Sequence, residues 1–172
     1  KFIKKINKKI RILSAASNSP YFFANFNFKI GMFNYEGKLL RTFQLKDQRY
    51  KSSYYHEIIV HPEKRLFAAI QDNGNIFIWN WNGDIIAKKI KKLFRYYSNN
   101  KSNSKFHESR PILYIIYPNK LIVFNINKNT LQELKSPYFK NIQGISYVDD
   151  KKIIFWTRGK TNTVTAKGNI FI

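Results

Sequence analysis

Cysteine is absent from this 172-residue sequence, and none of its apolar stretches is long. Without cysteine the chain has no disulfide, no thiolate metal site and no cysteine nucleophile, a composition that suits a reducing compartment. No apolar run approaches the roughly 20 residues that a membrane-spanning helix needs, and no signal-peptide pattern follows the charged N-terminus. We therefore expect an intracellular protein without a membrane span, in the cytoplasm or an organelle interior.

Residues with catalytic chemistry are scarce as well. No cysteine or carboxylate cluster accompanies the three histidines, His56, His61 and His107, and we expect His61 to form local hydrogen bonds in a turn. Asp149 and Asp150 are adjacent, and such side chains in a turn point apart. The seven glycines form no phosphate-binding loop, dinucleotide-binding pattern or nucleophile elbow. We therefore expect no enzyme, no catalytic residue, no metal, no cofactor and no small-molecule substrate.

Acidic residues are few, and positive charge dominates. The chain has 31 Lys and Arg against 10 Asp and Glu, which gives a formal net charge of +21. The excess positive charges repel one another unless a polyanion neutralises them. The candidate partners are therefore nucleic acid, an acidic protein or an anionic membrane surface. An alternative is drift toward residues with A/T-rich codons. Drift alone does not account for so few acids, because their codons are also fairly A/T-rich.

A short phrase of an aromatic residue followed by asparagine recurs along the chain. Phe33-Asn34 is followed by Trp79-Asn80 and then by Phe124-Asn125, at spacings of 46 and 45 residues (79 − 33 = 46 and 124 − 79 = 45). Each phrase ends a run of alternating apolar residues. A period of this size is typical of repeat architectures.

Turn signals divide each period into short strands. In the second period, Pro62, Asp72-Asn73-Gly74 and Asn82-Gly83 separate four runs rich in apolar residues, and Asn-Gly between such runs is a strong hairpin signal. Four strands joined by tight turns form one antiparallel blade.

The second period resembles a WD40 repeat. The resemblance lies in His61-Pro62 before one strand, Asp72-Asn73-Gly74 before the next, and Trp79-Asn80 at the end of that strand. It implies an all-β protein of antiparallel four-stranded blades from a WD40-like β-propeller, incomplete in this chain. The aromatic residue would pack between blades, and the polar residue after it would cap the following turn. The sequence has Asn where the family has Asp, and no clear Gly-His pair.

We expect one partial propeller domain over residues 1–172, with repeats at approximately 10–46, 54–91, 105–136 and 141–172. The polar, low-complexity segment around residues 98–104 predicts a flexible insertion at 95–110. The last five residues duplicate residues 74–78, so the chain stops just before the next expected aromatic residue. We expect these residues to be part of a larger propeller; the alternative is a reduced open propeller whose edges are covered by partners.

Two lysine-rich groups are the predicted contacts with RNA or another polyanion. They are Lys88, Lys89, Lys91, Lys92 and Arg95, and Lys4, Lys5, Lys8 and Lys9. Residues 1–10 are also compatible with a basic amphipathic helix, but residues 4–9 echo residues 88–93, and this favours an outer strand and connector.

These patterns favour a non-catalytic scaffold or structural subunit of a large assembly, in particular a ribosome-like ribonucleoprotein. Its partners would be RNA and the other protein subunits. The alternative is a scaffold for protein–protein interaction in trafficking, the cytoskeleton or assembly, without nucleic acid, which resemblance to WD40 proteins most often implies.

Overall fold

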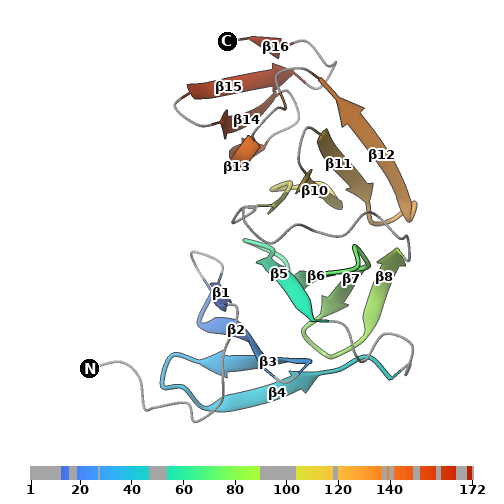
Figure 1. The fold of residues 1–172 in the computed structure, drawn as a ribbon. Coiled ribbons are helices and arrows are strands. Elements are labelled where there is room, and N and C mark those ends of the chain that lie inside the picture. The colour runs from blue at the N-terminus through green and yellow to red at the C-terminus, as the bar shows by residue number, and fades with distance from the viewer. Residues whose placement is uncertain are drawn as a thin grey trace. The chain divides into compact units, whose positions relative to one another are not determined.

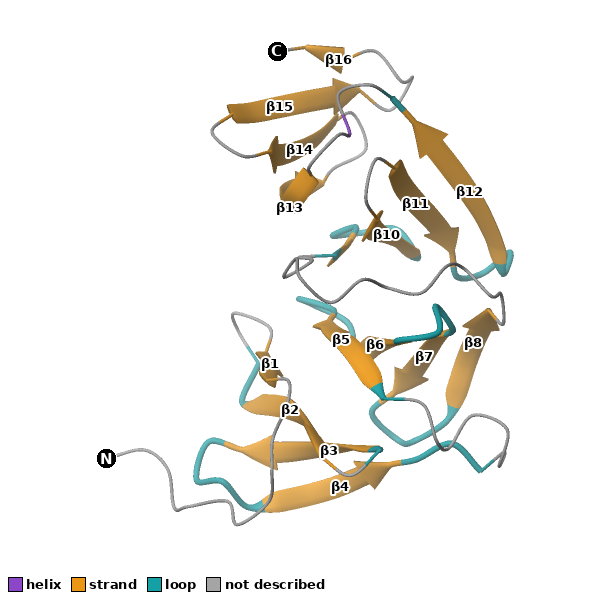
Figure 2. Ribbon diagram, in the orientation of Figure 1, coloured by secondary structure: helices purple, strands orange, loops and turns teal. Residues whose placement is uncertain are grey.

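The structure is a computed structural model that describes residues 13–15, 19–26, 28–46, 54–89, 104–117, 120–136, 139, 142–148, 152–157, 160–165 and 170–171. The chain divides into two compact units, Lys1–Tyr96 and Tyr97–Ile172. Strands and the turns between them make up nearly all of the described residues (Figure 2).

The first unit contains two four-stranded antiparallel sheets (Figure 1). The strands of the first sheet are β1 (Leu13–Ala15), β2 (Tyr21–Phe26), β3 (Lys29–Asn34) and β4 (Leu39–Phe43). Those of the second sheet are β5 (Tyr55–Val60), β6 (Leu66–Gln71), β7 (Ile76–Asn80) and β8 (Ile85–Lys89). Each strand pairs with the next one along the chain, because tight turns join neighbouring strands. The expected antiparallel four-stranded blades are confirmed in this unit.

The second unit also contains two such sheets. The strands of the third sheet are β9 (Lys105–Phe106), β10 (Ile112–Tyr117), β11 (Lys120–Asn125) and β12 (Thr130–Lys135). Those of the fourth sheet are β13 (Ile142–Val148), β14 (Lys152–Thr157), β15 (Lys160–Thr165) and β16 (Ile170–Phe171). All pairs between neighbouring strands are antiparallel.

Strand β9 lies where the predicted flexible insertion, 95–110, overlaps the predicted third repeat, 105–136. It pairs with β10 through Phe106 and Lys105, and both Phe106 and His107 are buried. Residues 104–110 therefore form the first strand and first turn of the third sheet, where burial of the Phe106 ring outweighs a polar local composition. The other residues of that range, 95–103, lie outside the described residues.

Burial differs strongly between the strands of one sheet. In β7 four of the five residues are buried, whereas in β4 four of the five are exposed. The middle strands are covered on both faces, and the last strand of each of the first two sheets faces solvent. Side chains of the last strands are therefore available to a partner.

The core of the first unit lies between its two sheets. Phe23 of β2 and Phe43 of β4 lie against Phe67 of β6, with ring centroids 4.7 and 4.8 Å apart. Phe67 in turn stacks on Trp79, with centroids 5.3 Å apart and planes 10° apart. Because these contacts cross from one sheet to the other, they hold the two sheets against each other within this unit.

The second unit has a core of the same kind. Tyr114, Ile116 and Leu121 of the third sheet belong to one buried cluster with Ile142, Ile145, Ile153 and Phe155 of the fourth sheet. Phe139, in the connection between the two sheets, packs on Phe155 with ring centroids 5.5 Å apart.

The repeated aromatic-asparagine phrase has the same local geometry in three sheets. The aromatic residues are all buried: Phe33, Trp79 and Phe124. The side-chain Oδ1 of each asparagine accepts a hydrogen bond from a backbone N–H in the following turn. The donors to Asn34, Asn80 and Asn125 are the amides of Lys38, Asp84 and Lys128, at 2.9, 2.9 and 3.0 Å. Each asparagine thus caps the turn that leads to the last strand of its sheet.

Two histidines shape the turns between the first and second strands. His61 Nδ1 accepts hydrogen bonds from the backbone N–H groups of Glu63 and Lys64, at 3.1 and 3.0 Å. His107 holds the corresponding turn of the third sheet in the same way, through the amides of residues 109 and 110. The expected local hydrogen bonds of His61 are therefore present, and His107 repeats them.

Candidate functional site

Two of the predicted basic residues lie on the last strand of the second sheet. Lys88 and Lys89 close β8, where Lys88 is exposed and Lys89 is half-buried. The other predicted contacts lie outside the described residues: Lys91, Lys92, Arg95, Lys4, Lys5, Lys8 and Lys9. That these two lysine-rich groups contact RNA or another polyanion therefore stays a prediction.

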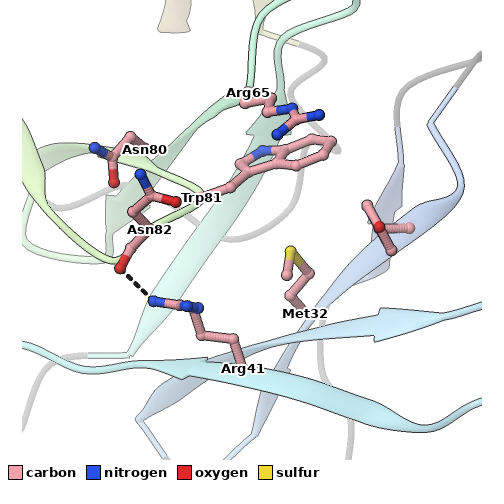
Figure 3. Close-up of a pocket in the computed structure, with 7 residues that line it drawn as sticks. Met32, Arg41, Arg65, Asn80, Trp81 and Asn82 are labelled. Carbon is pink, nitrogen blue, oxygen red and sulfur yellow. Dashed lines mark hydrogen bonds between the residues drawn. The ribbon is translucent and has the colours of Figure 1, made fainter.

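A pocket of about 310 Å³ lies between the first and second sheets. It is lined by residues of β2, β3 and β4 on one side, and by the end of β7 and two turns of the second sheet on the other (Figure 3). The lining residues are Tyr21, Met32, Arg41, Arg65, Asn80, Trp81 and Asn82. Aromatic and cationic side chains thus converge on this cavity.

Trp81 is held at the centre of this lining by contacts from both sheets. Its backbone N–H donates to the carbonyl oxygen of Arg65 at 3.0 Å, which ties the β7–β8 turn to the β5–β6 turn. The Tyr21 ring meets the indole edge to face, with centroids 5.3 Å apart and planes 82° apart. Phe23 lies behind it at a centroid distance of 5.9 Å. The indole is therefore fixed in orientation before any ligand arrives.

Arg41 bridges the two sheets from the opposite side. It stands on the exposed strand β4, and its Nη1 donates to the backbone carbonyl oxygen of Asn82 (Figure 3). Gly83, the next residue in that turn, has a φ of 101°, a left-handed conformation that glycine adopts without strain. The turn thus presents its carbonyl group to the guanidinium, and Arg41 keeps further N–H donors at the pocket.

The polar groups of the pocket offer mainly donors. None of the described lining residues is acidic. Asn80 is committed to its own turn, because its Nδ2 donates to Asp84 Oδ2 at 2.9 Å and its Oδ1 accepts from the Asp84 amide. The Trp81 Nε1 atom is buried and not exposed to the cavity, so the charged donors that a ligand can reach are those of Arg41 and Arg65. The pocket therefore suits an electronegative ligand rich in acceptors.

From the sequence alone, Trp81, Arg41 and Arg65 were not identified as site residues. A signal was present in the repeat register. At the position of Arg65 the first and third sheets have Pro20 and Pro111, each immediately before the second strand. A comparison of equivalent positions would therefore have identified the arginine as a residue that the fold does not require.

One acid of the third sheet, Glu133, is engaged with two lysines. On the third sheet, Glu133 lies 3.1 Å from Lys120 Nζ and 3.5 Å from Lys135 Nζ. The hydrogen bond from Lys120 is the main cause that lowers the pKa of the Glu133 carboxyl. Two lysines thus share one acid, and this part of the sheet keeps a net positive charge.

Within the described ranges, no group of three or more His, Asp or Glu residues is placed to hold a metal ion. In the same residues, no helix is long and apolar enough to cross a membrane.

No family model matches the chain, and no curated protein matches it. Its structure is similar to 844 solved chains, among them the structure of U3-55K and the crystal structure of RRP9 WD40 repeats. Each of these two matches has a TM-score of 0.76 at 12% identity over 99% of this chain. The chain spans about half of their length, 53% of U3-55K and 52% of RRP9.

These likenesses confirm the expected WD40-like fold and the resemblance carried by the second period. Identity of 12% establishes the fold alone, because propellers carry many unrelated functions. The function must therefore be argued from the chain's own charge and site.

Proposed function

We propose that the protein is a non-catalytic scaffold subunit of a large ribonucleoprotein assembly, ribosome-like in kind, and that its lysine-rich segments contact RNA phosphates. Its partners are RNA and the other protein subunits of the assembly. The observation that carries this proposal is the net charge of +21 on a fold of antiparallel blades. A surface so cationic attracts a polyanion at long range and gains affinity as condensed counterions are released.

The outer strand of the second sheet supports the proposal locally. Lys88 is exposed on β8, and its pairing partner across the ladder is Phe77 of β7, which is buried. The strand is thereby anchored by the core while its lysine side chain reaches solvent. A cation on a rigid strand contacts a phosphate with a smaller loss of conformational entropy than one on a free tail.

A second candidate function is a protein–protein scaffold without nucleic acid. The observation that favours it is a set of exposed apolar residues at the start of the last strands, Leu39 and Leu40 on β4 and Ile85 and Ile86 on β8, each 40–45% exposed. Such residues are usual where one protein docks on another. They are compatible with the first proposal too, because a subunit of an assembly needs both kinds of contact.

The test is RNA binding as a function of salt. The 172-residue chain is titrated into a fluorescein-labelled 12-nucleotide oligouridylate, and fluorescence anisotropy is measured over a series of NaCl concentrations. The logarithm of the binding constant should fall linearly with the logarithm of salt concentration, by about 0.7 per phosphate contacted on a single strand. No binding at low salt, or a flat salt response, would remove the proposal.

The contribution of β8 is tested by Lys88→Gln, with Lys38→Gln as the matched control. Both lysines are exposed, and both substitutions remove one charge. Lys88→Gln should reduce the slope by about 0.7 and weaken binding, whereas Lys38→Gln should change neither. Equal effects of the two variants would mean that β8 is not a specific contact.

A further inference from the structure

The tryptophan and the two arginines that line the pocket between the first two sheets are not found at the equivalent positions of the other sheets. Trp81 occupies the position of Tyr35 in the first sheet and Ile126 in the third. Its backbone hydrogen bond to residue 65 does not depend on the side chain, because Ile126 N–H makes the same bond to Pro111 at 2.8 Å. The fold therefore needs the backbone of this turn but not an indole.

The two arginines also depart from the repeat. Arg65 stands where the first and third sheets have proline. Arg41 pairs with Met32 of β3, and the residue with the corresponding pairing in the second sheet is the buried Ala87. Two arginines and an indole thus meet at one cavity, at positions where the other sheets carry different residues. Trp81 and Arg41 also join the two sheets, but the repeat itself does not require these residue types, and this points to a ligand.

The free hydrogen-bonding capacity at the cavity indicates an anionic ligand. The Arg65 side chain is exposed, and no ion pair or side-chain hydrogen bond engages its guanidinium within the described ranges. Arg41 donates from Nη1 to the Asn82 carbonyl oxygen, and the other N–H groups of its guanidinium can still donate to a ligand. Guanidinium groups bind phosphate or carboxylate oxygens in pairs of hydrogen bonds.

The remaining lining indicates that the ligand also has a flat apolar part. Met32 and the Tyr21 and Trp81 rings contribute this surface. A volume of about 310 Å³ lies at the lower end of the range for small-ligand pockets, roughly 300–1,000 Å³. A carboxylate side chain would engage the arginines but would not use the apolar part of the lining. A nucleotide supplies both a phosphate and a ring.

We propose that this pocket binds one nucleotide of a single-stranded RNA, with its phosphate on Arg41 and Arg65 and its base against Trp81. The inference rests on the proposed RNA contact and adds a discrete subsite to it. Stacking on aromatic side chains accepts any base, so the subsite would position the strand rather than read its sequence.

The test compares four variants with the parent chain in the same anisotropy assay. Trp81→Leu removes the ring and should weaken binding of the 12-nucleotide RNA about fivefold or more, the size of one stacking contact, whereas Trp81→Phe keeps a ring and most of the affinity. Arg65→Gln should weaken binding and lower the salt slope by about 0.7, as loss of one phosphate contact requires. Lys64→Gln is the matched control, since this exposed residue precedes Arg65 in the same turn but does not line the pocket.

Each outcome decides between this subsite and the general proposal. If Arg65→Gln and Lys64→Gln weaken binding equally and Trp81→Leu has no effect, the subsite is wrong and only distributed charge binds RNA. If the parent chain binds no RNA, both proposals fail; a fluorescein-labelled hexaglutamate peptide that binds in a Trp81- and Arg65-dependent manner would then assign the pocket to an acidic protein. Thermal melting of each variant separates loss of binding from loss of folding, and the exposed Arg65 tests the pocket even if Trp81→Leu unfolds.

Discussion

Single residues explain why two turns of this chain, those after Asn34 and Asn80, begin with asparagine where WD40 repeats have aspartate. The Asn80 side chain caps the β7–β8 turn through Oδ1 and donates from Nδ2 to the Asp84 carboxylate. Asn34 does the same with Glu36, at 3.2 Å. An aspartate at either position would keep the cap but would face a second carboxylate. The amide is therefore matched to an acid in its own turn.

Because only some of these asparagines have an acid in their turn, the same Asn→Asp substitution should lower the free energy of unfolding by different amounts in two sheets. Asn80→Asp loses the hydrogen bond to Asp84 and places two carboxylates together, so it should lower the free energy of unfolding by about 1 kcal/mol. Asn125→Asp is the control, because its turn contains Lys128 and no acid, and it should change stability by less than about 0.5 kcal/mol. Urea denaturation at neutral pH measures both. The explanation is wrong if the two variants are equally stable.

At the scale of elements, the pairing of β13 with β14 depends on one glycine. The ladder has irregularities on both sides of Gly144, which lies opposite Trp156. A Cβ added at Gly144 would lie 2.1 Å from two atoms of the Trp156 ring. The indole therefore lies directly on the backbone of the neighbouring strand, and only glycine leaves room for it.

Gly144→Ala should destabilise the chain by about 1–3 kcal/mol, because the indole or the strand must move. The measurement is urea denaturation followed by circular dichroism. The control is the same substitution in a Trp156→Leu background, where the ring is gone and the added methyl group should cost much less. Equal costs in the two backgrounds would contradict a clash with the indole.

At the scale of the whole molecule, the large net positive charge determines how stability depends on salt. A net charge of +21 opposes compaction through self-repulsion. Salt screens this repulsion, since the Debye length falls from about 30 Å at 0.01 M to about 8 Å at 0.15 M. The chain should therefore be more stable in moderate salt, whatever its partner is.

Raising NaCl from 0.01 to 0.15 M should raise the Tm by about 3 °C or more, which corresponds to about 1 kcal/mol for a chain of this size. Differential scanning calorimetry at constant pH measures the shift. Choline chloride at equal ionic strength should give the same rise if screening is the cause. An unchanged Tm would show that the lysines are spaced widely enough not to destabilise the fold.

The architecture was predictable because its signals are local. Alternation of apolar residues and turn residues act over a few neighbours, and the aromatic-asparagine phrase repeats the same local pattern in each sheet. Together they correctly predicted antiparallel four-stranded blades with a WD40-like fold. The short strand β9 was less visible, because only two of its residues pair and the segment before it is polar.

By itself, then, the sequence determined most of the strands, their order within each sheet, the capped turns and the excess of positive charge. Only the tertiary structure decided which side chains meet at the pocket. Tyr21 and Trp81 are 60 residues apart in sequence (81 − 21 = 60), and Arg41 contacts the turn at Asn82 from a different sheet. The physical reason is that contacts within a sheet follow from short turns, whereas contacts between sheets depend on how two hydrophobic faces pack, and no local spacing encodes that packing.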